Sequence, residues 1–195
     1  FVCIFKNFVL DPSIKPLKPE HKIAGQIFTI QGSSNTSYSH HETLLAWTGM
    51  LSKAPSDKIL ICQPNDNIAA FMGELSAEYL LKKNIRGYIT DGGCRDVEFI
   101  NNINFPVWSK FNTPKDIVGY WKPDVLEGEI TIGDVIINNN DYVMADIDGV
   151  VIIPQSNIVE ILEKSELLIN TESKVRKSIR EGMDPQEAYI KYSAF

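Results

Sequence analysis

The chain has 195 residues, of which 44% are apolar, which is enough for one domain with a substantial hydrophobic core. Its formal net charge of −6 at pH 7 argues against a nucleic-acid partner, because surfaces that bind nucleic acid are normally basic. No apolar run is long enough to span a bilayer, and residues 1–10 lack the pattern of a signal peptide. The three cysteines, Cys3, Cys62 and Cys94, lack metal-ligand spacing, so we expect a reducing, cytoplasmic compartment.

The first part of the chain predicts strands and helices in turn. Apolar residues alternate over residues 23–30, which predicts a strand, and the small polar residues at 32–39 predict a loop. The apolar run after His40 and His41 predicts a helix, and residues 58–62 predict a buried strand. Neighbouring histidines point about 100° apart on a helix, so this pair is a poor candidate for binding one metal ion.

The central stretch, residues 73–98, predicts a helix, a strand and a loop in succession. The helix is expected to begin near Gly73, and the strand to cover residues 87–90. The loop at residues 91–93 contains two glycines that are free to adopt positive φ. This loop leads directly to Arg95 and Asp96.

The rest of the chain predicts more strands and a helical tail. A short helix or turn is expected at residues 96–102, a loop at 112–123, and helix from about residue 157 onward. Strands are expected at residues 107–111, 129–132, 142–146 and 150–153. Because strands and helices do not alternate regularly, a doubly wound sheet is disfavoured, and the pattern indicates mixed α and β structure. No repeat or domain boundary is visible, so residues 1–195 are expected to form a single domain with a C-terminal helical tail.

The predicted geometry brings charged groups together. Because the predicted helix and the strand after it run antiparallel in space, the start of the helix and the end of the strand lie at the same edge. Glu74 should therefore lie close to Arg95 and Asp96. The start of a helix offers free N–H groups to a carboxylate, and arginine adds a planar fork of donors. Carboxylates are the ligands that Mg²⁺ takes, directly or through water. Such a site suits chemistry that builds negative charge on an oxygen.

The spacing of these residues resembles a known signature. Glu74, twenty intervening residues and then Arg95-Asp96 is similar to the Asp-x20-Arg-Asp signature of the class II pyruvate aldolases, which share a fold with the RraA-like regulators of ribonuclease activity. Residues 105–108, 133–136 and 145–154 resemble further family segments, so the resemblance extends from about Lys15 to the C-terminus. One departure is Glu74, where the aldolases usually carry Asp. The longer side chain keeps the charge but can move a metal-bound water.

The resemblance implies a fold, a reaction and an assembly. The fold would be α/β, a layered β/β/α domain of the swivelling type, assembled as a homotrimer or hexamer. The reaction would be metal-dependent cleavage of 4-hydroxy-2-oxo acids, such as 4-hydroxy-4-methyl-2-oxoglutarate, to pyruvate, with decarboxylation of oxaloacetate. Its partners would be a small 2-oxo acid and other subunits, with no nucleic acid and no membrane. The signature loop has carboxylates and an arginine but no lysine, which favours a cation over a Schiff base as the electron sink.

The resemblance also implies a role for each residue. Asp96 would ligate Mg²⁺ (or Mn²⁺) directly, and Glu74 would hold a metal-bound water. Residues 171–176 of this chain resemble the tail segment of the family that carries a further acid. Glu172 in this segment would contact the metal ion through water, from a neighbouring subunit. Arg95 would neutralise the charge of the enolate. The substrate carboxylate would bind at the helix start, formed by Gly73, Glu74, Leu75 and Ser76.

A second interpretation belongs to another class of protein. A non-catalytic regulator of the RraA type would bind a ribonuclease or helicase instead of a substrate. Regulators of that branch tend to lose the acid after the arginine, so the presence of Asp96 favours the enzyme. For Arg95 and Asp96 the plainer alternative is a local ion pair that braces a loop.

Four other residues have open alternatives. Glu172 can equally be a solvated helix acid. Cys94, beside an arginine, can be a thiol of lowered pKa, although a small residue that fills a tight loop is the favoured interpretation. Asp146 and Asp148 are candidate acids, for which turn roles beside a glycine are favoured.

Overall fold

The computed structural model describes residues 8–194. Cys3 and most of residues 1–10, which were considered as a signal peptide, lie outside the described residues. Contacts divide the chain into two compact units. One is Asn7–Gln155, and the other contains the tail from Ser156 onward. The division falls beside residue 157, where the sequence predicts the start of the helical tail.

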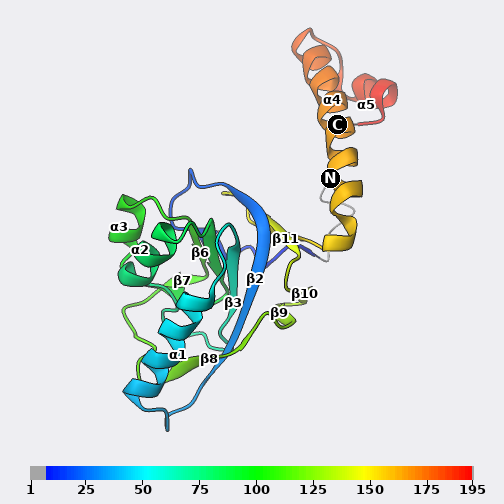
Figure 1. Ribbon diagram of the computed structural model, residues 1–195. Helices are drawn as coiled ribbons and strands as arrows, with labels where there is room; N and C mark the ends of the chain where they lie inside the picture. Colours follow the sequence, from blue (N-terminus) through cyan, green and yellow to red (C-terminus); the bar gives the residue numbers. More distant parts are fainter. Residues whose placement is uncertain (1–7, 195) are drawn as a thin grey trace. The chain divides into compact units, whose positions relative to one another are not determined.

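The larger unit is built on a twisted sheet of eight strands (Figure 1). In spatial order it runs β1 (Lys15–Pro16), β6 (Val107–Ser109), β4 (Gly87–Thr90), β3 (Ile59–Gln63), β2 (Ile23–Ser34), β11 (Tyr142–Ala145) and β12 (Val150–Ile153), with β8 (Trp121–Leu126) also paired to β2. The central strands β2, β3, β4 and β6 are parallel, whereas the outer pairs are antiparallel. Consequently the carboxyl ends of β3, β4 and β6 share one edge, where the loops that carry the site emerge.

The sheet is covered by different structures on its two faces (Figure 1). Helices α1 (His40–Lys53), α2 (Glu74–Lys82) and α3 (Val97–Asn102) cover one face, and the hairpin of β9 (Ile130–Ile132) and β10 (Val135–Ile137) covers the other. The helical side encloses a core around Trp47, Phe71 and Trp121, and the hairpin side encloses one around Ile14 and Trp108. This arrangement confirms the layered β/β/α fold predicted from the sequence.

The sequence prediction is wrong at β2 and β8. Strand β2 continues to Ser34, through the first three residues of the loop expected at 32–39, because β8 pairs with it antiparallel across a register shift at Gln31/Gly32. Strand β8 itself takes up the last three residues of the loop predicted for residues 112–123 and continues to Leu126. It contains Pro123, which an edge strand tolerates because a residue there does not need to donate to the ladder.

The loop before Arg95 also differs from the prediction. Gly92 and Gly93 are not among the residues with positive φ; the left-handed residue is Asp96 (φ 56). The two glycines are instead required by close packing, since an added Cβ at Gly92 would lie 2.4 Å from the Phe71 ring, and one at Gly93 would lie 2.6 Å from the Ala69 carbonyl oxygen. Gly93 begins a short strand, β5 (Gly93–Cys94), which pairs with β7 (Phe111–Asn112). The strand predicted at 107–111 is therefore two strands, β6 and β7.

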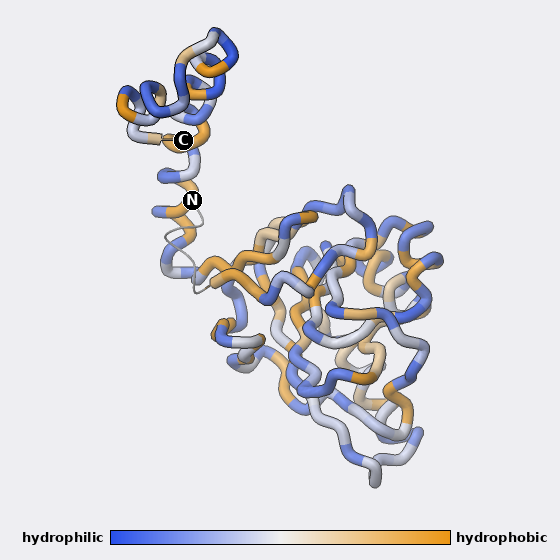
Figure 2. Tube along the Cα trace, turned by 180° about the vertical axis from the view of Figure 1, so that it is seen from behind, coloured by the Kyte–Doolittle hydropathy of each residue, from blue (hydrophilic) through white to orange (hydrophobic). Residues whose placement is uncertain are grey.

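The smaller unit is a helical hairpin. A single 3₁₀ turn, η3 (Gln155–Asn157), leads into α4 (Ile158–Arg180), and α5 (Pro185–Tyr192) follows. The predicted tail is thus two helices, separated at Gly182 (φ 94) and restarted by Asp184, whose side chain accepts from the backbone of Gln186. Hydrophilic and hydrophobic residues are interleaved along both helices (Figure 2). No helix in the described part of the chain combines the length and apolar character that crossing a membrane requires.

Gly32 provides a test of the packing of β2 against β8. An added Cβ at Gly32 would lie 2.1 Å from the Trp121 ring and 2.4 Å from a backbone oxygen, so Gly32→Ala should lower the free energy of unfolding by about 1–3 kcal/mol. Gly49, within α1, has nothing within 4 Å of that position, so Gly49→Ala should raise it by about 0.5–1 kcal/mol. Urea denaturation at pH 7 measures both, and equal effects would contradict this account of Gly32.

Candidate active site

The start of α2 is capped from a distance. Gly73, at the N-cap position, has no side chain to cap the helix, and the backbone N–H of Glu74 instead donates to Oδ2 of Asp96 at 3.0 Å, from 22 residues away. An added Cβ at Gly73 would lie 2.8 Å from both Nε of Arg95 and Oδ2 of Asp96. Glycine is therefore what allows these two side chains to lie against the helix start.

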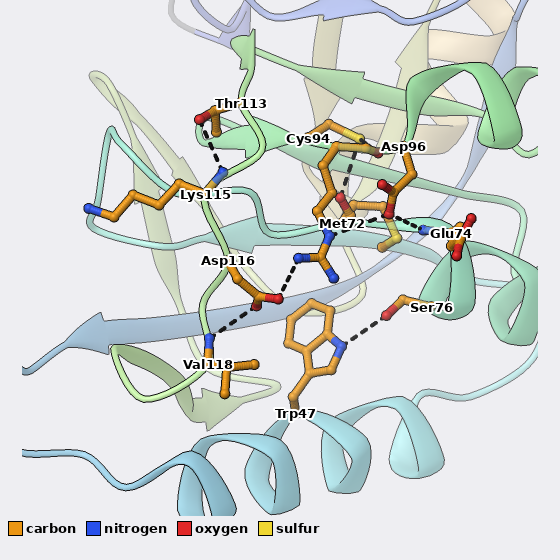
Figure 3. A network of polar contacts seen from close by, with 11 residues as sticks. Trp47, Met72, Glu74, Ser76, Cys94, Asp96, Thr113, Lys115, Asp116 and Val118 are labelled. Atoms are coloured by element: carbon orange, nitrogen blue, oxygen red, sulfur yellow. Dashed lines mark hydrogen bonds and ion pairs between the residues drawn. The ribbon is translucent and has the colours of Figure 1, made fainter.

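Arg95 connects two carboxylates at the edge of the sheet. Its backbone N–H donates to the Met72 carbonyl at 2.9 Å, which fixes the loop beside α2. Its Nε lies 3.3 Å from Oδ2 of Asp96, and its Nη1 donates to Oδ2 of Asp116 (Figure 3). The three side chains are between 34% and 42% exposed, so this is a half-buried network open to a ligand on one side.

Asp96 adopts a left-handed backbone conformation with φ 56 and ψ 36, immediately before α3. Among residues with a side chain, Asp and Asn tolerate this region best. Its carbonyl accepts from the N–H of Ile100 at 3.0 Å, so the residue starts α3 with its backbone and caps α2 with its side chain. The structure thus brings together Glu74, Arg95 and Asp96, as the sequence predicts. The roles of these residues stay predictions.

Asp116 was not identified from the sequence. It lies in the loop after β7, and no motif or spacing connects it with Arg95. Partial burial acts to raise the pKa of Asp116, but hydrogen bonds from Arg95 and from the backbone N–H groups of Val118 and Ile117 outweigh burial and lower it. For Arg95, burial acts to lower the pKa, but Asp116 and Asp96 raise it, so the guanidinium keeps its charge.

A cavity of about 540 Å³ opens beside this network. It is lined by the start of α2, by the loop with Arg95 and Asp96, and by residues 112–114. Among the described residues, no hydrogen-bond acceptor is paired with the backbone N–H groups of Leu75 and Ser76. Because a helix start carries partial positive charge, these two groups and Arg95 are the donors at this cavity that suit an anion.

The residues at this site fit a divalent cation of the magnesium type. Within residues 8–194 there is no cluster of three or more His, Cys, Asp or Glu side chains that would enclose an ion. Mg²⁺, however, is commonly held by one or two carboxylates, with waters and substrate completing its shell. Oδ2 of Asp96 accepts from Glu74 and contacts Arg95, while its Oδ1 accepts no hydrogen bond from the described residues. That oxygen, with the Glu74 carboxylate on the same cavity, is the donor set available to the ion.

The other candidate residues have structural roles or lie elsewhere. Burial raises the pKa of the Cys94 thiol to about 12, so the alternative of a reactive thiolate is wrong. Asp146 accepts from the N–H of Asp148 at 2.9 Å, which confirms the turn role favoured for this pair. Glu172 lies exposed on α4, in the smaller unit, and its proposed contact from a neighbouring subunit stays a prediction.

The chain belongs to the RraA-like family, whose description is Aldolase/RraA, because a model of this family matches residues 4–152. Those residues include every part of the network around Arg95 and stop before α4.

Three relatives illustrate the range of the family. Protein DlpA of Legionella pneumophila is 28% identical over 92% of this chain. The matched part makes up 29% of the length of DlpA. A protein of Halalkalibacterium halodurans named "Putative 4-hydroxy-4-methyl-2-oxoglutarate aldolase" is 25% identical over 93% of this chain and 83% of its own length. The third is the crystal structure of Streptomyces coelicolor RraAS2, described as an unusual member of the RNase ES inhibitor RraA protein family. It matches with a TM-score of 0.78 and 22% sequence identity, over 88% of this chain and 85% of the RraAS2 chain. At that identity the last likeness shows the fold alone.

The ion pair between Arg95 and Asp116 should make stability depend on pH. Because the folded-state pKa of Asp116 is lowered from about 3.8, its stabilisation is present above that pH and is lost as the pH falls through the folded-state value. Asp116→Asn should therefore lower the free energy of unfolding at pH 7 by about 0.2–1 kcal/mol, the range for exposed pairs, and by less at pH 3. Urea unfolding at several pH values measures this. Asp134→Asn, at an exposed turn, is the control, and a constant difference between Asp116→Asn and wild type would contradict the prediction.

Proposed function

We propose that this protein is a divalent-metal-dependent lyase that cleaves 4-hydroxy-2-oxo acids to pyruvate and also decarboxylates oxaloacetate. The observation that carries the proposal is the convergence of Arg95, Asp96 and the free N–H groups of α2 on one cavity. Both reactions break a carbon–carbon bond and leave its electrons on a pyruvate enolate. The site must therefore bind a 2-oxo acid and stabilise negative charge on its keto oxygen.

The start of α2 binds the carboxylate of the substrate. The N–H groups of Leu75 and Ser76 donate to it, and the partial positive charge of the nine-residue helix favours the anion. This contact fixes the 2-oxo acid with its keto oxygen toward the loop of Arg95. Ser76 also accepts from Nε1 of Trp47 through its hydroxyl at 2.9 Å, which ties the helix start to α1.

Arg95 stabilises the charge that develops in the reaction. Its Nε and Nη1 are held by Asp96 and Asp116, so the guanidinium is already oriented, and its remaining N–H groups are available to the enolate oxygen. A donor that is fixed before the reaction costs no reorganisation in the transition state. Asp116 is in this sense a positioning residue, since it acts through Arg95.

Asp96, through Oδ1, and Glu74 would hold Mg²⁺ or Mn²⁺. When bound, such an ion supplies Lewis-acid stabilisation of the developing negative charge. The Glu74 side chain is exposed on the cavity, where it can hold a water near the substrate and exchange a proton through it. Glu172 of a neighbouring subunit is the remaining candidate acid, and its contribution requires the predicted trimer or hexamer.

Oxaloacetate tests the reaction directly. We expect pyruvate release that requires added Mg²⁺ or Mn²⁺ and stops with a chelator, after subtraction of the rate without protein. Asp96→Asn, which keeps a residue suited to the left-handed backbone, and Arg95→Lys, which keeps the charge but loses the planar fork, should each lower kcat by about 10²–10³-fold. Glu98→Gln, an exposed acid on α3 outside the cavity, is the matched control. Variants as active as wild type would overturn the mechanism.

Gly73 separates the geometry of the site from the stability of the fold. Gly73→Ala places a Cβ 2.8 Å from Nε of Arg95 and from Oδ2 of Asp96, so these two side chains, and not the backbone, must shift. We expect pyruvate release from oxaloacetate to fall at least about tenfold, because small misplacement of positioned groups is costly to the rate. The free energy of unfolding in urea should fall by no more than the loss of the Asp96 cap on α2 costs, about 0.5–2 kcal/mol, so the protein stays folded while the rate falls. A variant of full activity would show that contact between Gly73 and the two side chains is not needed.

A further inference from the structure

A second cavity, of about 390 Å³, adjoins the candidate active site and shares the start of α2 and Arg95 with it. It lies between α1, α2 and the loop after β7 (Figure 3). We call it the apolar groove, because its main wall residues are Leu44, Trp47, Leu51, Tyr79, Ile117 and Val118. A ligand bound by its carboxylate at the start of α2 can therefore extend directly into this groove.

The walls of the groove present apolar surface to solvent. Leu44 is 46% exposed and Tyr79 is 42% exposed, although both are large hydrophobic residues. Trp47 is 7% exposed, and its only polar atom already donates to the hydroxyl of Ser76 at 2.9 Å. The part of its ring that stays exposed therefore offers apolar contact alone, so burial of a hydrophobic group against this surface is favourable.

The charges of the groove disfavour a second carboxylate. Among the described residues, Arg95 is the only one with a cationic side chain that lines either cavity, and it already contacts Asp96 and Asp116. Asp116 itself lines the groove, and Glu74 lines the neighbouring cavity. A second carboxylate in the groove would lose water, meet like charge and find no unpaired cation among the described lining residues.

We propose that the apolar groove binds an apolar substituent on C4 of the substrate. The preferred substrates are then monocarboxylic 4-hydroxy-2-oxo acids with an aliphatic or aromatic C4 group, and not dicarboxylic ones. This inference rests on the proposed function, and it adds the class of substrate that the same site selects.

The reaction with such a substrate balances without a further reactant. In 4-hydroxy-2-oxo-4-phenylbutanoate the C3–C4 bond breaks, and its electron pair passes to C3 and the keto oxygen as the enolate. The C4 hydroxyl loses its proton and becomes the carbonyl of benzaldehyde. A proton added at C3 then completes pyruvate.

Two substrates that differ only at C4 test the proposal. With the metal-loaded protein, kcat/KM for 4-hydroxy-2-oxo-4-phenylbutanoate should exceed that for 4-hydroxy-2-oxoglutarate, which has a carboxylate in place of the ring, by at least about tenfold. Calorimetric titration with two ligands that cannot be cleaved, 2-oxo-4-phenylbutanoate and 2-oxoglutarate, should show the same order of affinity.

A pair of variants on α1 locates the effect in the groove. Leu44→Lys adds a cation at an exposed position of the groove. It should weaken the binding of 2-oxo-4-phenylbutanoate, strengthen the binding of 2-oxoglutarate, and reduce or reverse the preference for the phenyl substrate. Leu45→Lys adds the same charge one residue further on, at a position 62% exposed that does not line the groove, and should leave the preference unchanged.

The outcomes separate this inference from the proposed function. Metal-dependent release of pyruvate from oxaloacetate, together with equal or better use of the dicarboxylic substrate, would overturn the groove proposal and leave the lyase intact. Failure of every substrate would overturn the lyase. In that case the titrations decide on the groove, since equal binding of both ligands, or equal effects of the two lysine variants, would overturn it as well.

Discussion

The site depends on one carboxylate oxygen, Oδ2 of Asp96, which accepts the first N–H of α2 and contacts Nε of Arg95. Helix α2 cannot cap itself, because its N-cap residue is glycine. The same oxygen therefore satisfies a helix end and fixes an arginine, while Oδ1 of Asp96 accepts no hydrogen bond from the described residues. Fold and chemistry are joined here, since an interaction that completes a helix also orients the groups that would bind substrate.

The parallel sheet explains why these groups meet. Strands β3, β4 and β6 end at one edge, and the segments that follow them supply the start of α2, the loop of Arg95 and the loop of Asp116. Three parts of the chain that are distant in sequence are thereby brought within hydrogen-bonding distance. Two acids on one arginine hold the guanidinium on two sides, which a single ion pair would not do.

The sequence predicted the meeting of Glu74 with Arg95 and Asp96, because a helix and the strand after it must place these ends together. Asp116 could not be predicted, since its contact depends on how a loop after β7 folds back and no periodicity records that. The sequence indicated only that Gly92 and Gly93 are free to adopt positive φ; glycine is required there for packing, while Asp96 adopts the left-handed conformation. Strand β8 was missed because its pairing, and not its composition, makes it a strand.

The left-handed backbone of Asp96 also limits how this position can change over evolution. Glycine adopts that conformation at the least cost, and asparagine and aspartate adopt it more readily than most residues with a side chain; a single nucleotide change converts an aspartate codon to either of the other two. Both replacements remove the charge and keep the turn. A lineage can therefore lose the acid at this position in one mutational step and keep the turn. The acid is regained only by the reverse substitution at the same position.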